Sequence, residues 1–156
     1  MNDALKFIPF ESQYSNEFKT LNVEWLETFF VVEPYDELVL TNPVEEIIQP
    51  GGFIFMVALK GKIIGTFAFL KKGNGVFEFS KMAITPKERG KGYGNKIVQF
   101  VIRFAEQHHW DKLILYSSTI LENSIHLYRK YGFIEVPIDP DIKYARGNIK
   151  MELDLK

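Results

Sequence analysis

The stretch that decides the fold of this chain is Thr85-Pro86-Lys87-Glu88-Arg89-Gly90-Lys91-Gly92-Tyr93-Gly94-Asn95-Lys96. It lies between an apolar run, Val76 to Ile84, and an amphipathic segment, Ile97 to Gln107, an order that predicts strand, glycine-rich turn and helix. A helix N-terminus offers free backbone N–H groups and a partial positive charge, so it can bind a phosphate. The glycines remove side chains that would block close approach, and Arg89 and Lys91 add positive charge. We therefore expect this turn to bind a diphosphate.

Two common phosphate-binding loops do not fit the turn. A Walker loop ends in Gly-Lys-Ser/Thr, but neither Lys91 nor Lys96 is followed by Ser or Thr. A dinucleotide fingerprint needs Gly-x-Gly-x-x-Gly, whereas the third glycine here comes one residue early and Asn95 stands in its place. This spacing argues against a nucleotide-binding regulator. A glycine-rich turn that only caps an ordinary helix remains the alternative.

Length and composition indicate one globular domain, residues 1–156. Apolar residues make up 46% of the chain and charged residues 25%, as in proteins that bury a core. The net charge of −1 argues against nucleic acid as a partner, because binding phosphates takes a clustered basic surface. The sequence has no cysteine, which excludes a cysteine acyl-enzyme and thiolate metal sites. We see no signal peptide and no apolar run long enough to span a bilayer, so we expect a cytoplasmic protein without membrane contact.

The first half of the chain alternates between strand and helix patterns. Ala4 to Phe10 predicts a strand, and Ser12 is placed to cap a helix that runs to Phe29 or Phe30. Its apolar face is expected at positions with helical spacing, namely Tyr14, Phe18, Leu21, Trp25 and Phe29. The acidic stretch 33–37 interrupts this pattern, and a short helix, Val44 to Ile48, follows. Phe53 to Leu59 and Ile63 to Leu70 predict two buried strands joined by a tight turn at residues 60–61.

The second half predicts strand–helix–strand units. After the helix that ends near Gln107, Lys112 to Ser117 predicts a strand. Asn123 or Ser124 is placed to cap a helix that runs to residue 130 or 131, and Gly132 is expected to end it in a left-handed conformation. Strands over 133–136 and from Ile149 onward complete the chain. Hairpins first and strand–helix–strand units later predict a mixed α/β sheet.

Two motifs in this framework resemble one known family. Arg89-Gly90-Lys91-Gly92-Tyr93-Gly94 has the form Arg-x-x-Gly-x-Gly and resembles the coenzyme-A pyrophosphate loop of the GNAT superfamily, the acetyl-coenzyme-A-dependent N-acetyltransferases. Asn123-Ser124-Ile125-His126-Leu127-Tyr128-Arg129-Lys130-Tyr131-Gly132-Phe133 resembles the family's second coenzyme-A segment. The two motifs occur in the family's order, each at a strand–helix junction. The first half of the chain resembles the family only in its pattern of elements.

The resemblance implies a fold, a cosubstrate and a set of binding residues. The fold is a mixed, mostly antiparallel central sheet of about seven strands flanked by about four helices. The cosubstrate is acetyl-coenzyme A, with no metal, and the second substrate is an amine. Main-chain groups of Met82, Ala83 and Ile84 are expected to bind the pantetheine arm, with the Met82 N–H as oxyanion donor. The remaining coenzyme contacts are assigned to Arg89, Gly90, Lys91, Gly92, Tyr93, Gly94, Asn95, Asn123 and Tyr128.

Acetyl transfer to an amine needs a base, because an amine with a pKa near ~10.4 is mostly protonated at neutral pH. Glu78 is the candidate, in the strand that enters the turn, where it alternates with Phe77 and Phe79 on the other face. In several GNAT enzymes a glutamate at the matching strand position is implicated as base. The alternative is that Glu78 lies on a solvated face or pairs with a basic residue.

The departing thiolate benefits from a proton, and Tyr128 is the candidate acid because its phenol is a hydrogen-bond donor. The resemblance points to Tyr128 rather than Tyr131. The alternative is an aromatic core residue, three positions after Ile125 on the same helix.

Three other features bear on function. His108, His109 and His126 lack the spacing of metal ligands with carboxylates, so we expect surface or helix-end roles. The acidic residues Glu33, Asp36 and Glu37 either attract a cationic amine or form a solvated loop. Arg146, beside Tyr144, either binds an acceptor carboxylate or pairs with an acid. These features favour different acceptors.

The sequence thus predicts a GNAT-type N-acetyltransferase that acetylates a primary amine of a small molecule or peptide by direct transfer in a ternary complex. The alternative is a sensor or interaction module of the same fold that binds coenzyme A without turnover. The oligomeric state stays open, a homodimer included.

Overall fold

A computed structural model describes residues 4–140 and 146–156. Seven strands form one sheet with the order β1-β2-β3-β4-β5-β7-β6. The pairs β1–β2, β2–β3, β5–β7 and β6–β7 are antiparallel, and β4–β5 is parallel. The strands are β1 (Lys6–Pro9), β2 (Phe53–Leu59), β3 (Lys62–Gly73), β4 (Val76–Ile84), β5 (Lys112–Ser117), β6 (Ile134–Val136) and β7 (Ile149–Asp154). The predicted mixed, mostly antiparallel sheet is confirmed.

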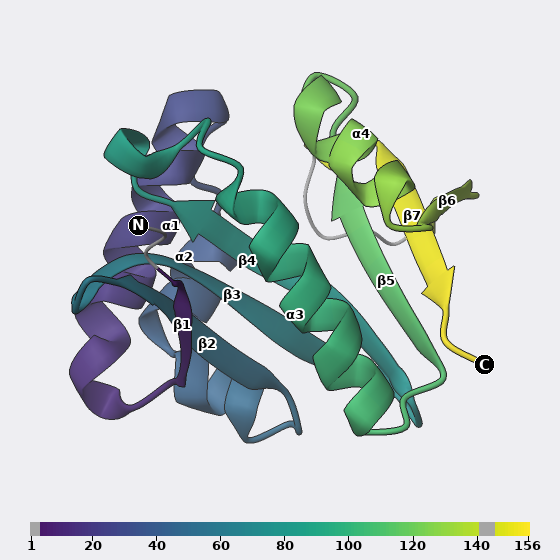
Figure 1. Ribbon diagram of the computed structural model, residues 1–156, viewed down its shortest axis with the longest axis horizontal. Coiled ribbons are helices and arrows are strands. Elements are labelled where there is room, and N and C mark those ends of the chain that lie inside the picture. Colours follow the sequence, from purple (N-terminus) through teal and green to yellow (C-terminus); the bar gives the residue numbers. More distant parts are fainter. Residues whose placement is uncertain (1–3, 141–145) are drawn as a thin grey trace. The chain divides into compact units, whose positions relative to one another are not determined.

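Four α-helices and three shorter helical segments occur in the described residues (Figure 1). The α-helices are α1 (Ser15–Phe29), α2 (Pro34–Thr41), α3 (Tyr93–Gln107) and α4 (Glu122–Lys130). The shorter segments are the 3-10 turns η1 (Ser12–Tyr14) and η3 (Pro86–Glu88) and the π-helical turn η2 (Val44–Ile48). The predicted bounds of β2, β4, β5 and η2 agree with the structure residue for residue.

The chain forms two compact units. The first extends to Lys71 and includes Ser80–Lys91, and the second consists of Lys72–Phe79 and the chain from Gly92 onward. Strand β4 therefore contributes its first part to the second unit and its last part to the first.

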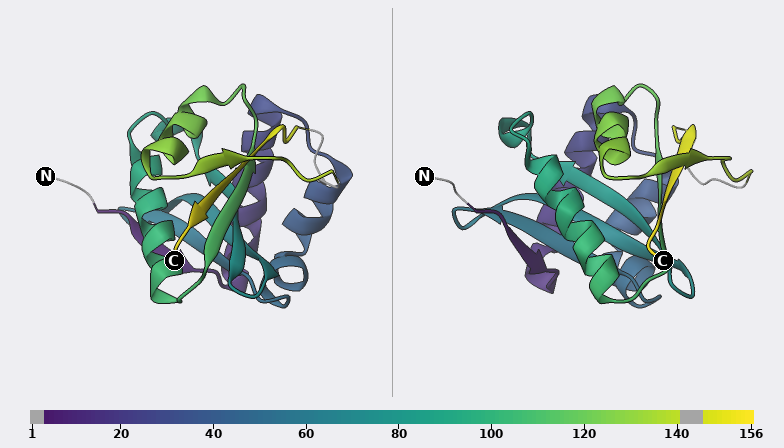
Figure 2. Two further views of the ribbon diagram at one scale, coloured as in Figure 1. Left: turned by 90° about the vertical axis from the view of Figure 1, so that its right-hand side faces the viewer. Right: turned by 45° about the vertical axis from the view of Figure 1, so that its right-hand side comes forward.

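The core of the first unit lies between its helices and strands β2 and β3. Both α1 and α2 pack on the same face of these strands (Figure 2). The buried side chains of this cluster are Phe18, Leu26, Val39, Leu40, Ile47, Ile54, Met56 and Ala68. On β2 the alternate residue Phe55 stacks on Phe67 of β3, with ring centroids 5.6 Å apart. Both faces of these strands are buried, which explains their almost continuous apolar sequence.

The predicted apolar face of η1 and α1 is confirmed in part, since Phe18 is buried and Tyr14, Leu21 and Trp25 pack against the core. Phe18, Asn22 and Leu26 are buried, whereas Phe29 is 40% exposed. Asn22 is tolerated inside because its side-chain amide donates to the Phe18 carbonyl, 2.9 Å away. The spacing of apolar residues does not predict a buried amide.

The expected break at residues 33–37 is wrong, because α2 begins there. Pro34 stands at the first turn, where its missing N–H costs nothing. The Glu33 and Asp36 side chains form a reciprocal capping box, and the Asp36 carboxylate accepts from the Glu33 backbone N–H at 2.8 Å. Acidic residues that read as a loop are thus the start signal of a helix.

Candidate active site

The sheet of the second unit has two chemically different faces. Across the ladder Glu78 lies beside Ile114, which lies beside Glu152, and Tyr116 lies beside Lys150 in the next row. Because side chains alternate along strands, these rows share one face. We call it the charged face, formed by Glu78, Lys112, Tyr116, Lys150 and Glu152.

The opposite face is apolar and buried. Its side chains include Phe77, Leu113, Leu115 and Met151, each no more than 5% exposed. Phe77 stacks on Trp110, which follows α3, with ring centroids 3.6 Å apart. This face holds the core of the second unit, whereas the charged face presents the carboxylates and lysines of these strands.

Glu78 is nearly buried on the charged face, and its residue is 7% exposed. Its Oε1 lies 3.3 Å from the Nζ of Lys72, whose side chain is 41% exposed. The solvated-face alternative is therefore wrong, whereas the ion-pair alternative is what the structure shows. A paired carboxylate can still accept a proton, so the role of Glu78 as base stays a prediction.

The rest of the charged face is held by ion pairs and a phenol–carboxylate hydrogen bond. Asp139, in the loop after β6, accepts hydrogen bonds from the Tyr116 hydroxyl and, at 3.1 Å, from Lys150 Nζ. These two hydrogen bonds and, more weakly, the charge of Lys72 lower the pKa of Asp139. Sequence reasoning missed Lys72 and Asp139, since no motif contains them.

Tyr128 projects from α4 onto the apolar side. Its ring meets Phe79 and Phe133 edge to face, with centroids 6.2 and 6.0 Å away. Burial raises the pKa of Tyr128 to about 12, so its phenol stays a proton donor at neutral pH. Glu78 and Phe79 alternate on β4, so the candidate base and the candidate acid are on opposite faces of that strand.

The parallel ladder between β4 and β5 ends at Glu78 and Ile114. Residues 115–117 of β5 continue to pair with β7 on their other side. A backbone edge without its ladder partner can take up an extended ligand by adding a strand. The candidate base is therefore in the last paired row, next to this edge.

Further along β4, the backbone departs from regular strand geometry at Lys81, whose φ is +56°. A left-handed residue inside a strand is rare for a lysine and typical of a bulge or a functional site. It directly precedes Met82, Ala83 and Ile84, the predicted pantetheine contacts. Alternation of apolar and polar residues gives no signal for such a kink, so the sequence did not predict it.

The glycine turn has the backbone conformation that its glycines permit. Gly90 and Gly92 have φ of +76° and +83°, and a Cβ at either would meet no atom within 4 Å. Gly92 is also the N-cap of α3, and no side chain caps this end or adds an acidic charge to its first turn. The residues thus fit a diphosphate, because no capping side chain or acidic charge competes with an anion at this helix N-terminus. Tyr93 and Gly94 begin the helix itself.

Arg89 has three contacts within the first unit. Its Nε donates to the Ile84 carbonyl at 2.8 Å, and its Nη2 forms an ion pair with Glu24 of α1. The guanidinium also lies over the Phe29 ring, 5.4 Å from its centroid. The side chain assigned to the diphosphate therefore also anchors the start of the turn to α1.

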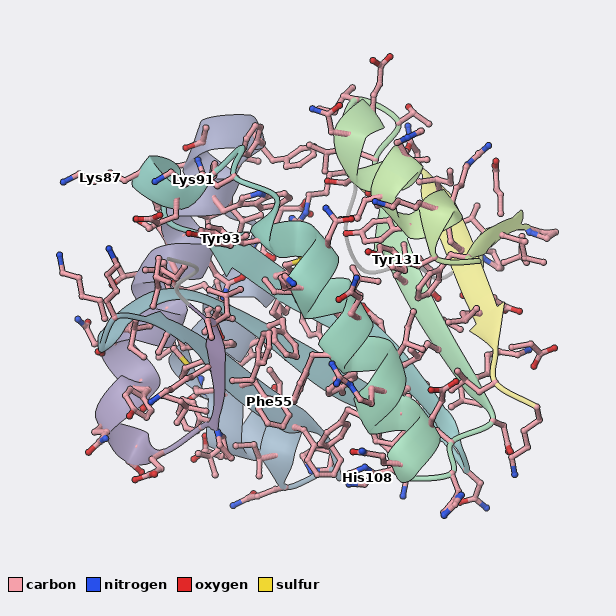
Figure 3. All side chains as sticks on the ribbon, in the orientation of Figure 1. Phe55, Lys87, Lys91, Tyr93, His108 and Tyr131 are labelled. Atoms are coloured by element: carbon pink, nitrogen blue, oxygen red, sulfur yellow. The ribbon has the colours of Figure 1, made fainter. Side chains whose placement is uncertain are left out.

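The other polar side chains of the turn have partners too. Lys91 forms an ion pair with Glu88 at 3.0 Å, and Lys87 and Lys91 extend outward from the turn in Figure 3. Asn95 accepts hydrogen bonds through its Oδ1 from Lys130 and from the Tyr131 hydroxyl, at 2.9 and 3.0 Å. The Asn95 side chain thus joins the first turn of α3 to the end of α4.

The capping role predicted for Asn123 or Ser124 is wrong. Helix α4 begins at Glu122, its N-cap is Leu121 and no side chain caps it. Asn123 is exposed in the first turn, one position inside the helix. Gly132 ends the segment with φ of +100°, as predicted.

The features that favoured different acceptors have structural partners. Glu37 forms an ion pair with Lys19 at 2.8 Å, which lowers the pKa of the Glu37 carboxyl, and Asp36 is buried in the capping box. Arg146 takes part in an interaction, whereas Tyr144 lies outside the described residues. Neither feature therefore decides the acceptor.

His108 stacks on Phe104 at the end of α3, with centroids 4.0 Å apart. Within residues 4–140 and 146–156, no group of three or more His, Cys, Asp or Glu side chains is placed to bind a metal. In the same part of the chain, no helix is both long and apolar enough to cross a membrane.

The sequence model of the acetyltransferase (GNAT) family matches residues 17–133 of this chain. This chain belongs to the GNAT acetyltransferase family. The match includes the glycine turn, Glu78 and Tyr128.

Curated relatives extend the comparison. N-acetylaspartate synthetase of Xenopus tropicalis is 29% identical over 93 residues, 58% of this chain and 34% of that protein. Mycothiol acetyltransferase of Arthrobacter is 27% identical over 110 residues, 67% of this chain and 33% of that protein. The chain thus spans about a third of the length of these two relatives. An uncharacterized N-acetyltransferase of Schizosaccharomyces pombe is 25% identical over 122 residues, 76% of this chain and 75% of that protein.

Solved structures share the fold. An acetyltransferase of the GNAT family from Staphylococcus aureus superposes with a TM-score of 0.85 and 19% identity, covering 98% of this chain and 100% of that one. Spermidine N-acetyltransferase from Vibrio cholerae, solved with coenzyme A and spermine, has a TM-score of 0.75 and 19% identity, covering 97% and 95%. At such identities the likeness concerns the fold.

Proposed function

We propose that residues 1–156 act as one N-acetyltransferase domain that moves the acetyl group of acetyl-coenzyme A to a primary amine. The observation that carries the proposal is the placement of Glu78 and Tyr128 on opposite faces of β4, next to the end of the β4–β5 ladder. One face then receives the amine, and the other receives the sulfur of the thioester.

The coenzyme contacts follow from the open turn. Backbone N–H groups of residues 89–95 bind the diphosphate at the N-terminus of α3, and Lys91 adds a cation. Main-chain groups of Met82, Ala83 and Ile84 bind the pantetheine arm, and the kink at Lys81 turns the Met82 N–H toward the thioester oxygen. Asn123 and Tyr128 complete the contacts from α4. Because Arg89 is held by Glu24 and the Ile84 carbonyl, it contributes more by shaping the turn than by direct contact.

The reaction balances without a covalent enzyme intermediate. Glu78 accepts a proton from the acceptor ammonium, directly or through water, and the neutral amine attacks the thioester carbonyl. A C–N bond forms and the C–S bond breaks, while the Met82 N–H stabilises the negative charge on the carbonyl oxygen. Tyr128 donates a proton to the leaving thiolate, and the second proton that the nitrogen loses as the amide forms returns to the Tyr128 oxygen, directly or through water. The sequence has no cysteine, and direct transfer in a ternary complex is the simplest route.

The relatives' names do not point to one acceptor, since they include N-acetylaspartate synthetase, streptothricin acetyltransferase and spermidine N-acetyltransferase. We propose a small-molecule or peptide amine, acetylated in the cytoplasm. The competing function is a sensor that binds coenzyme A without turnover. The glycine turn does not distinguish the two, because a transferase and a sensor would both bind the diphosphate there.

The test is free-thiol release from acetyl-coenzyme A with a panel of polyamines, amino acids, aminoglycosides and lysine-terminated peptides. We expect release that depends on the added amine, and a cysteine-free protein adds no background thiol. Coenzyme A binding without release on any amine would support the sensor instead. Absence of coenzyme A binding would contradict both.

A further inference from the structure

The ion pair at the candidate base bears on which amine the site accepts. The side chain of Glu78 is 9% exposed, and that of its partner Lys72 is 41% exposed, with 3.3 Å between Oε1 and Nζ. An amine that hydrogen-bonds the same Oε1 of Glu78 at about 3 Å therefore lies within about 6 Å of the Lys72 ammonium. The acceptor must tolerate, or use, a cation beside its reacting nitrogen.

The surrounding charges do not favour a polycation. Lys72, Lys112 and Lys150 each have a carboxylate oxygen 3.1 to 3.3 Å away, on Glu78, Glu152 and Asp139 respectively. Each of these three carboxylates thus already has a lysine partner, and a polyamine could bind one of them only by sharing it with that lysine. Like charges at such distances repel, most strongly where water is excluded.

A zwitterion matches the Lys72–Glu78 pair. In an amino acid the amine and the carboxylate are attached to one carbon, so both can lie alongside an ion pair of similar spacing. The amine then faces Glu78 and the carboxylate faces Lys72, which forms charge-assisted hydrogen bonds at both ends. Transfer of the ammonium proton to Glu78 leaves the acceptor carboxylate on Lys72, so the neutral amine stays in place for attack.

Among the lysines of this region, Lys72 is the suitable one. Lys150 is 13% exposed and bonds both oxygens of Asp139, at 3.3 and 3.1 Å. Lys112 pairs with Glu152 rather than with the candidate base. Only the Lys72 ammonium combines contact with Glu78 and substantial exposure.

We propose that Lys72 is a specificity-determining residue that binds the carboxylate of an amino-acid acceptor, with the reacting amine at Glu78. The inference rests on the proposed function for the identity of the reacting site. It assigns the acceptor class, free amino acids, that the sequence left open.

The experiment compares free amino acids with their carboxamides, which differ at the carboxylate. For each pair, kcat/KM is measured for the wild type, Lys72→Gln, Lys72→Arg and the control Lys156→Gln. Lys156 pairs with Asp111 at 2.9 Å and is 62% exposed, so the control removes a lysine ion pair that does not involve Glu78. If a Lys72 substitution also disturbs Glu78, kcat/KM falls for the amino acid and for its carboxamide alike. The ratio of the two kcat/KM values therefore isolates the contact between Lys72 and the carboxylate.

We expect the wild type to prefer at least one free amino acid over its amide by about tenfold or more, the worth of a charge-assisted hydrogen bond. Lys72→Gln should bring that ratio close to one, mainly by raising the KM of the acid. Lys72→Arg should retain much of the preference, and Lys156→Gln all of it. A wild type that prefers amides or polyamines, or a ratio unchanged in Lys72→Gln, would overturn the proposal.

Calorimetry of amino-acid binding, with coenzyme A present, separates the two proposals. If no amine supports thiol release, the proposed transferase function fails. Amino-acid binding that weakens in Lys72→Gln but not in Lys156→Gln would then still support the Lys72 site. Equal binding by all variants, or no binding, would reject it.

Discussion

The two faces of the sheet in the second unit are made by the same strands and serve different ends. Phe77, Leu113 and Met151 fill one face and are at most 5% exposed. On the other face, one residue away along the strands, lie Glu78 and Lys150 with their ion-pair partners. Burial of apolar area stabilises the first face, whereas ion pairs of modest net worth organise the second.

The difference teaches where substitutions should affect stability and where they should affect catalysis. A shift of one residue along a strand moves a side chain from one face to the other. Neighbours in sequence should therefore give opposite results in stability and activity assays. The predictions below test that separation.

The largest effect is expected for Glu78→Gln. Loss of a general base should lower kcat by roughly 100-fold or more, while the affinity for coenzyme A changes little. The partner Lys72 is 41% exposed, so the substitution leaves no buried unpaired charge and the protein should stay folded. Steady-state kinetics with an amine identified by thiol release, and coenzyme A binding by calorimetry, give the two numbers.

Glu152→Gln is the matched control, since Glu152 shares the charged face and pairs with Lys112 at 3.2 Å. It should retain nearly full kcat. Equal losses in both variants would mean that the ion pairs, rather than a base at Glu78, support activity.

On the apolar face, Met151→Ala should lower the free energy of unfolding by about 2–5 kcal/mol, because it leaves a cavity in a packed core. Met151 is 0% exposed. Glu152→Gln, the next residue on the same strand, should cost about 1 kcal/mol or less. Urea denaturation measures the free energy of unfolding of both variants. Equal losses would show that substitutions on the two faces do not differ in their effect on stability.

The smallest expected effect is that of Tyr128→Phe, on rate and on alkaline stability. Loss of the proton donor should slow transfer, by less than the roughly 100-fold expected for Glu78→Gln, with Tyr131→Phe, at the C-cap of α4, as the control. Desolvation raises the pKa of Tyr128 to about 12 in the folded protein, from ~10 when unfolded. Its contribution to stability is therefore complete below about pH 10 and is lost as the pH rises toward about 12.

Denaturation at about pH 9 and about pH 11 tests this linkage. The wild type should lose more stability between the two than Tyr128→Phe does. The same loss in both would mean that the phenol is hydrated in the folded protein, and a full-rate variant would assign Tyr128 to the core alone.

Much of the fold could be predicted because the signals are local. The bounds of β2, β4 and β5 follow from apolar runs that end at turn residues. The left-handed Gly132 follows from a conformation that only glycine adopts easily. The errors were local as well: α2 was missed because Glu33 and Asp36 act as caps, and the N-cap of α4 was placed at Asn123, two positions after Leu121.

The site could be predicted only in part. The alternation of side chains along β4 placed Glu78 on the face opposite to that of Phe77 and Phe79, and the two motifs identified the turn and Tyr128. The alternation of side chains along a strand does not show which residues of other segments contact them, so Lys72 and Asp139 were missed. The kink at Lys81 was missed because nothing in the local sequence demands a left-handed lysine.

By itself the sequence determined the family, the mixed sheet and the open glycine turn. These properties depend on periodicity and on backbone preferences over a few residues. Only the tertiary structure decided which charges meet. Arg89 is anchored to Glu24 of α1, 65 positions earlier in the chain, and Lys72 of β3 pairs with Glu78 of β4. Such contacts depend on how the strands and helices are brought together, because Coulomb interactions act through space rather than along the chain.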